Sequence, residues 1–63
     1  MQLIMKTEFD NIRLNDNYEY DSNKNSEVEV VKIYHNGNLI CKKRIKNRKV
    51  SYYGIKNYKD YMT

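Results

Sequence analysis

The residues best suited to chemistry are a run of cations and the two tyrosines that follow it. Six of the eight residues from position 42 to position 49 are lysine or arginine. Ammonium and guanidinium groups neutralise phosphates and aromatic rings stack on bases, so this composition is typical of a surface that binds nucleic acid. The candidate macromolecule-binding residues are Lys42, Arg44, Lys46, Arg48, Lys49, Tyr52 and Tyr53.

A structural interpretation of the same run is equally open. On a strand, the alternation of side chains groups Lys42, Arg44 and Lys46 on one face, where glutamates of a neighbouring strand can neutralise them. Lysines also protect the edge of a sheet against aggregation. The run therefore predicts either a binding surface or a solvated face whose charges are paired within the chain.

The sequence gives little support for catalysis or metal binding. We expect the one histidine, His35, to be a solvated residue beside a turn, and the one cysteine, Cys41, to be an inert thiol in the core. One Cys and one His cannot build a structural zinc site. Residues 21–26 begin like a calcium loop, but Ser26 and Lys32 occupy the positions that need Gly and Glu. We therefore predict a protein that is not an enzyme, with no catalytic residue, metal or cofactor.

Charge is divided unevenly between the two halves of the chain. Residues 1–31 hold seven acidic and three basic side chains, whereas residues 32–63 hold nine basic side chains and one acidic one. Such asymmetry indicates an electrostatic partner. A single cysteine fits a reducing compartment, and no apolar stretch is long enough to span a membrane. We therefore expect a cytoplasmic protein that does not bind membranes.

The element that must position the cations is a β-hairpin. Asn36-Gly37 separates two strand-like runs, and this dipeptide favours a two-residue type I′ turn. In that register Glu29 faces Arg44, and Glu27 faces Lys46, on the solvent side. The face expected in the core carries Val28, Val30, Tyr34, Leu39, Cys41 and Ile45. A three-residue loop, which shifts the pairing by one residue, is the alternative.

The flanking segments complete a small β-rich α+β domain that spans residues 1–63. Apolar residues alternate from Leu3 to Phe9 and continue with Ile12, Leu14, Tyr18 and Tyr20, so one or two strands are predicted in this stretch, with breaks at Asp10-Asn11 and at residues 15–17. The polar residues 21–26 predict a loop. A short C-terminal helix is predicted by the spacing of Tyr52, Ile55, Tyr58 and Met62. A strand over residues 49–53 followed by a shorter helix is the competing interpretation. The predicted fold is an antiparallel meander of three to four strands with its central hairpin turning at Asn36-Gly37.

The function expected from these features is binding to another macromolecule. Seven tyrosines exceed what so small a core can hold, and exposed rings anchor protein partners as readily as bases. The richness in Lys, Asn, Tyr and Ile is typical of AT-rich bacterial or phage genes. In style, and without a shared motif, the chain resembles phage-encoded inhibitors of host nucleic-acid machinery, which include anti-CRISPR and other anti-defence proteins. The resemblance implies a non-enzymatic inhibitor or accessory factor that docks on a host protein. Direct nucleic-acid binding by residues 42–49 and a homodimeric interaction module are the alternatives.

Overall fold

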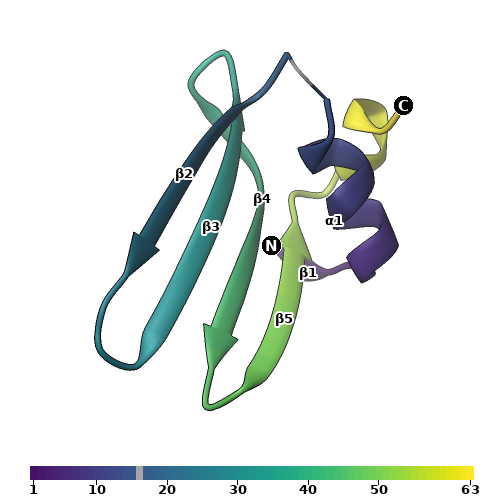
Figure 1. Cartoon of the computed structure of the whole chain (residues 1–63). Coiled ribbons are helices and arrows are strands. Elements are labelled where there is room, and N and C mark those ends of the chain that lie inside the picture. Colours follow the sequence, from purple (N-terminus) through teal and green to yellow (C-terminus); the bar gives the residue numbers. More distant parts are fainter. Residues whose placement is uncertain (16) are drawn as a thin grey trace.

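Five antiparallel strands form one sheet in the computed structural model, which describes residues 1–15 and 17–63 (Figure 1). The strands are β1 (Gln2–Leu3), β2 (Glu19–Lys24), β3 (Val28–His35), β4 (Asn38–Lys46) and β5 (Lys49–Gly54), and they lie in the order β1-β5-β4-β3-β2. Helix α1 (Lys6–Arg13) connects β1 to the segment before β2, and a short 3₁₀ helix, η1 (Tyr58–Tyr61), follows β5. The β-rich α+β class is confirmed, but the described residues hold more strands than the three to four predicted.

Helix α1 stands where alternating apolar residues predicted a strand. Phe9 and Ile12, three residues apart, are both buried, so one side of the helix faces the sheet. The Glu8 carboxylate accepts one hydrogen bond from the Tyr58 hydroxyl at 2.6 Å and another from the Met5 backbone N–H at 2.9 Å. Both bonds lower the pKa of Glu8 from its usual value, and the bond from Tyr58 has the larger effect. The strand prediction was wrong over α1, because a short alternation is outweighed by helix capping and by burial at three-residue spacing. Strands do form at the two ends of the predicted stretch, in β1 and at the start of β2.

The hairpin between β3 and β4 begins as predicted and then changes register. The φ angles of Asn36 and Gly37 are 52° and 79°, and a two-residue type I′ turn requires both to be positive. The residues next to the turn pair as expected, but Ile33 lies opposite Cys41. Ile40 is thereby left as the extra residue of a β-bulge.

The bulge changes every pairing beyond it. Ile45 takes the place opposite Glu29 that Arg44 was predicted to hold, so the predicted Glu29–Arg44 pair is wrong. The predicted pair of Glu27 with Lys46 is wrong for the same reason, because each partner moves by one residue. A one-residue shift also moves side chains to the other face of the sheet.

The predicted core face of β3 is therefore the wrong one. Ile33, which was expected on the solvent side, is fully buried. The face away from α1 instead carries Val28, Val30, Tyr34 and Leu39, all of which were expected in the core. On β4, Cys41 is buried as predicted.

The core lies between α1, η1 and one face of the sheet. Its buried side chains are Phe9, Ile12, Ile33, Ile40, Cys41 and Tyr58. The bulge is what brings the consecutive residues Ile40 and Cys41 into the core together. Burial raises the pKa of the Cys41 thiol to about 12. The thiol is therefore protonated at neutral pH, as an inert core cysteine should be.

The polar residues 21–26 do not form the predicted loop. They supply most of β2, and only Asn25 and Ser26 turn the chain into β3. The Asn25 side-chain oxygen accepts a hydrogen bond from the Val28 backbone N–H at 3.1 Å, which stabilises this turn. The predicted break at residues 15–17 includes Asp16, which lies outside the described residues.

After β4 the chain follows the competing interpretation, a strand and then a shorter helix. A Cβ atom on Gly54, the last residue of β5, would lie 3.0 Å from the Tyr58 Cβ, so any other residue here would push Tyr58 away from its present position. The turn between β4 and β5 was not predicted, and it holds Asn47 and Arg48 at φ angles of 52° and 64°.

Among the described residues, none of the helices has the length and apolar character needed to cross a membrane.

Candidate functional site

The two faces of the sheet differ in what lies on them. The covered face meets α1 and η1, whereas the opposite face, called the open face below, presents its side chains away from both. Cross-strand pairing places Lys32, Lys42 and Tyr53 side by side on β3, β4 and β5. Alternation then assigns five cations to the open face, namely Lys32, Lys42, Arg44, Lys46 and Lys49.

Two pairs of these cations lie directly opposite each other. Lys32 faces Lys42 between β3 and β4, and Lys46 faces Lys49 beside the β4–β5 turn. Like charges in directly opposed positions destabilise a sheet. Asp21 of β2 lies directly opposite Lys32 on the same face, whereas no carboxylate lies opposite the cations of β4 and β5. The one close ion pair within residues 1–15 and 17–63 is Lys6–Asp10 on α1. The cations of β4 and β5 therefore form a self-repelling surface that an anion would stabilise.

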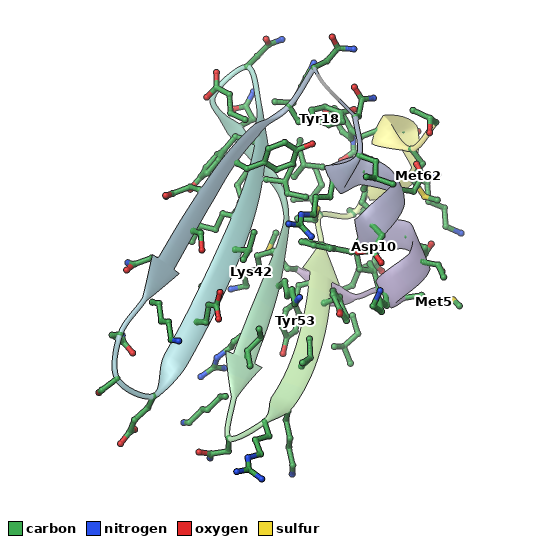
Figure 2. The ribbon with its side chains drawn as sticks, viewed as in Figure 1. Met5, Asp10, Tyr18, Lys42, Tyr53 and Met62 are labelled. Atoms are coloured by element: carbon green, nitrogen blue, oxygen red, sulfur yellow. The ribbon has the colours of Figure 1, made fainter. Side chains whose placement is uncertain are left out.

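The end of the open face near the β4–β5 turn is hollowed. A shallow cup of about 380 Å³ is lined by Arg44, Lys46, Asn47, Lys49, Ser51 and Tyr53. The Lys42 ammonium lies 5.5 Å from the centre of the ring of Tyr53, which lines the cup. Both residues are labelled in Figure 2. Cations, a hydroxyl and an aromatic ring thus converge on one concave surface, which suits a phosphate group next to a base.

Five of the seven predicted site residues come together in this arrangement. They are Lys42, Arg44, Lys46, Lys49 and Tyr53. Tyr52 instead lies on the covered face, where its ring centre is 5.2 Å from that of Phe9. Arg48 is at the tip of the β4–β5 turn with a left-handed backbone. The idea that Glu29 neutralises Arg44 is wrong, since Glu29 points to the covered face.

Sequence reasoning missed Lys32 and Ser51 as neighbours of the cations. Lys32 lies ten positions before the run, and only the register of β3 against β4 shows that it faces Lys42. Ser51 is uncharged, but it lies opposite Arg44 and lines the cup. Both residues could have been predicted from the correct register of β3, β4 and β5. That register was not predictable because the bulge at Ile40 shifts it by one residue.

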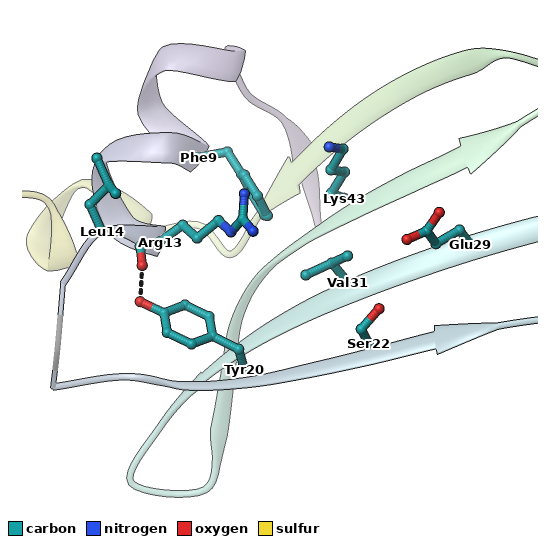
Figure 3. Close-up of a pocket in the computed structure, with 8 residues that line it drawn as sticks. All are labelled: Phe9, Arg13, Leu14, Tyr20, Ser22, Glu29, Val31 and Lys43. Carbon is teal, nitrogen blue, oxygen red and sulfur yellow. Dashed lines mark hydrogen bonds between the residues drawn. The ribbon is translucent and has the colours of Figure 1, made fainter.

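A second concave surface lies on the covered side, beyond the end of α1. This groove of about 620 Å³ is lined by Phe9, Arg13, Leu14, Tyr20, Ser22, Glu29, Val31 and Lys43 (Figure 3). The Tyr20 hydroxyl lies against the carbonyl oxygens of Arg13 and Asn15, 2.7 Å from the latter, and so ties β2 to the end of the helix. Leu14 is 81% exposed at its rim. The groove therefore combines exposed apolar atoms with charges of both signs.

His35 is not the solvated turn residue that was predicted. It is half-buried, and its ring centre lies 5.1 Å from that of Tyr18 and 5.5 Å from that of Tyr61. The aromatic contacts explain its place in the fold without any chemical role.

Among the described residues, His, Cys, Asp and Glu form no group of three or more that could hold a metal ion.

Comparison with models of protein families, with curated proteins and with solved structures finds no significant match to this chain. Its function must therefore be argued from the geometry and charge of the sites themselves.

Proposed function

We propose that the open face binds single-stranded nucleic acid. The observation that carries the proposal is the set of five cations, two pairs of them directly opposed, beside a cup with an aromatic rim. An arrangement that costs stability in the free protein is expected where a bound ligand compensates for it. Phosphates compensate for positive charge in this way, and their release of counterions drives nonspecific binding.

Strand geometry suggests how the backbone of the ligand lies. Lys42, Arg44 and Lys46 follow one another at every second residue of β4, about 7 Å apart, so they form a line of positive charge along the strand. The cup at the end of that line holds a phosphate between Arg44 and Lys49. The Tyr53 ring beside it offers a surface on which one base stacks.

A single strand fits this surface better than a duplex. The bases of a duplex are stacked on one another inside the helix, so an aromatic ring on a sheet face can stack only on bases that are unpaired. Both described helices, α1 and η1, lie on the other side of the sheet, so neither can carry the open-face cations into a major groove. We therefore expect binding to single strands with little dependence on base sequence.

The test is the salt dependence of binding to a fluorescent single-stranded oligonucleotide. If most of the five cations contact phosphates, the slope of log affinity against log salt should be about −3 to −4. Affinity should then fall roughly a hundredfold between 50 and 200 mM salt. Absence of binding to single-stranded DNA and RNA at 50 mM salt would overturn the proposal.

Neighbouring lysines supply a matched control for this test. Lys42→Gln removes a cation from the open face, whereas Lys43→Gln makes the same change one residue later, on the covered face. The first variant should flatten the slope by about 0.7, and the second should leave it unchanged. Equal effects of the two variants would show that total charge, and not the open face, attracts the oligonucleotide.

Docking on a partner protein, as the inhibitor expected from the sequence would do, is the second candidate function. The groove beside α1 favours it, because Leu14 and Tyr20, 81% and 45% exposed, present apolar surface next to Arg13, Glu29 and Lys43. Leu14→Asp should then abolish the complex and leave oligonucleotide binding intact. If the oligonucleotide does not bind and Leu14→Asp removes a partner retained by the wild-type chain, this function replaces the first.

A further inference from the structure

The two edges of the sheet are protected to different degrees. On one side β1 has two residues, and such a short strand offers little backbone for pairing. On the other side β2 has six residues, all of them exposed, and pairs with β3 without a bulge. It contains no proline. As an edge strand, β2 therefore has on its outer side backbone groups that β3 does not pair with, and its charges are the only usual protection that it carries.

The charges of β2 favour one particular partner, a second copy of β2. When two copies pair antiparallel, opposed residues must lie on the same face, so each register centres on one residue opposite itself. A register centred on Asp21 would place two carboxylates directly opposite each other. A register centred on Asn23 would place Glu19 opposite Glu27 of the other copy. Both are disfavoured by repulsion.

The register centred on Ser22 has no such conflict. It places the two Ser22 hydroxyls opposite each other, Asp21 opposite Asn23, and Tyr20 opposite Lys24. The first two contacts are between groups that can hydrogen-bond, and the third is between a cation and an aromatic ring. The strand is therefore complementary to itself in the register centred on Ser22.

We propose that the chain forms a symmetric dimer in which two β2 strands pair antiparallel, centred on Ser22. The two five-stranded sheets then continue as one sheet. The two-fold axis is perpendicular to the sheet, so both open faces lie on the same side, and so do both helices. On the open side, the carboxylates of β2 separate two basic surfaces, which gives the dimer two sites for one anionic strand. Two linked sites strengthen binding without any new contact.

Edge pairing of six residues makes a small interface, so the dimer should dissociate on dilution. Sedimentation of the wild-type chain should show the mass rising with concentration from 7.7 kDa towards twice that value. A mass of 7.7 kDa at every concentration up to the millimolar range overturns the proposal.

Disulfide cross-linking can determine the register in which the two β2 strands pair. Residues that face each other across antiparallel strands have Cα atoms about 4.5–5.5 Å apart, within the range that a disulfide spans. Ser22→Cys should therefore form a covalent dimer under mild oxidation. Ser22 is exposed, so the substitution leaves the core intact, and the native Cys41 is fully buried and does not compete.

Two further cysteine variants serve as controls. Ser26→Cys makes the same change at an exposed position of the turn after β2, which does not face itself in the proposed register. We expect Ser22→Cys to cross-link at least about tenfold faster than Ser26→Cys, since only the former holds its two thiols together. Equal rates would mean random collision and overturn the dimer. Faster cross-linking of Asp21→Cys than of Ser22→Cys would overturn the register. None of these outcomes depends on nucleic-acid binding.

Discussion

Two Lys–Tyr pairs lie next to each other in the β4–β5 hairpin but have different surroundings. Lys42 faces Tyr53 on the open face, and Lys43 faces Tyr52 on the covered face. The ammonium lies 5.5 Å from the ring centre in the first pair and 5.9 Å in the second, so the local contacts are almost the same. The surroundings are not, because the Tyr52 ring packs on Phe9 while the Tyr53 ring borders the cup.

The difference shows that position on the sheet, and not residue type, decides what a side chain does here. Strand alternation sends consecutive residues to opposite faces, so a run of similar cations and rings is divided between core and surface. The bulge at Ile40 then determines which half of the run is covered. Variants that act on one face alone can therefore test the comparison.

The largest expected effect separates Ile33 on the covered face from Val30 on the open face. Ile33→Ala should lower the free energy of unfolding by about 3–4 kcal/mol, because it leaves a cavity in the centre of the core. Val30→Ala should cost less than about 1 kcal/mol, since Val30 is only half-buried. Urea denaturation measures both values. If Ile33→Ala does not fold, Ile33→Val should still cost about 1 kcal/mol, and a larger loss for Val30→Ala would reverse the assignment of the faces.

Truncation of the two tyrosines should separate stability from binding. Tyr52→Ala should destabilise the fold by about 2–3 kcal/mol, because it removes the ring that packs on Phe9. Tyr53→Ala should change stability by less than about 1 kcal/mol but weaken oligonucleotide binding by about 1–3 kcal/mol if the ring stacks a base. Denaturation and anisotropy titrations on the same samples give the two quantities. Unchanged affinity in Tyr53→Ala would remove stacking from the proposed mode of binding.

Much of the fold was predictable from local signals. The turn at Asn36-Gly37, the strand-like runs on either side of it and the buried Cys41 follow from turn chemistry and apolar alternation. Helix α1 was not predicted. The Glu8 carboxylate that caps it is held by a hydrogen bond from Tyr58, which is far away in the sequence. The faces of the hairpin were also not predictable, since no local residue marks the bulge at Ile40.

The candidate site was predicted as a set of residues but not as a surface. The cluster of cations at residues 42–49 is visible in the sequence, and five of the seven chosen residues do lie together. Tyr52 and Tyr53 were predicted together because they are adjacent in the chain, but they lie on opposite faces of the sheet. Lys32 was missed because a cross-strand neighbour has no fixed spacing in the sequence.

Acid should loosen the contact between α1 and the rest of the core. The folded-state pKa of Glu8 is lowered from 4.5, chiefly by the Tyr58 hydroxyl. Its bonds to Tyr58 and Met5 therefore stabilise the fold fully above about pH 4.5, and this contribution is lost as the pH falls through the lower, folded-state pKa. Urea denaturation from pH 7 to pH 3 should show a smaller decline for Glu8→Gln than for the wild type. Equal declines would mean that Glu8 does not hold α1 to the sheet.

A stabilising change is expected at the β4–β5 turn. Arg48 has a φ of 64°, a conformation that costs a side-chain-bearing residue energy and that glycine adopts freely. Arg48→Gly should therefore raise the free energy of unfolding by about 0.5–1 kcal/mol, in contrast to the turn at Asn36-Gly37, which already has its glycine. Thermal denaturation measures the gain. A loss of stability would indicate that the Arg48 side chain makes contacts that stabilise the hairpin.

The smallest expected effect is a coupling of zero between Glu29 and Arg44. These residues would face each other if the hairpin had no bulge, but in the structure Glu29 lies opposite Ile45 and the two charges point to opposite faces. Lys24, by contrast, lies directly opposite Glu29 across β2 and β3, on the covered face. Residues that do not face each other give additive effects, whereas directly opposed charges couple.

A pair of double-mutant cycles with charge reversals tests this difference within one domain. The cycle of Glu29→Lys with Lys24→Glu should give a coupling of about 0.2–1 kcal/mol, because the reversed pair restores the attraction. The cycle of Glu29→Lys with Arg44→Glu should give a coupling near zero, because the sheet separates the two side chains. Both cycles share Glu29→Lys, so any general effect of the added charge appears in both and cancels in the comparison. A larger coupling with Arg44 than with Lys24 would indicate that the hairpin has the register without a bulge. In that register the cations of β4 face the glutamates of β3. The self-repelling surface from which nucleic-acid binding is inferred would then not exist.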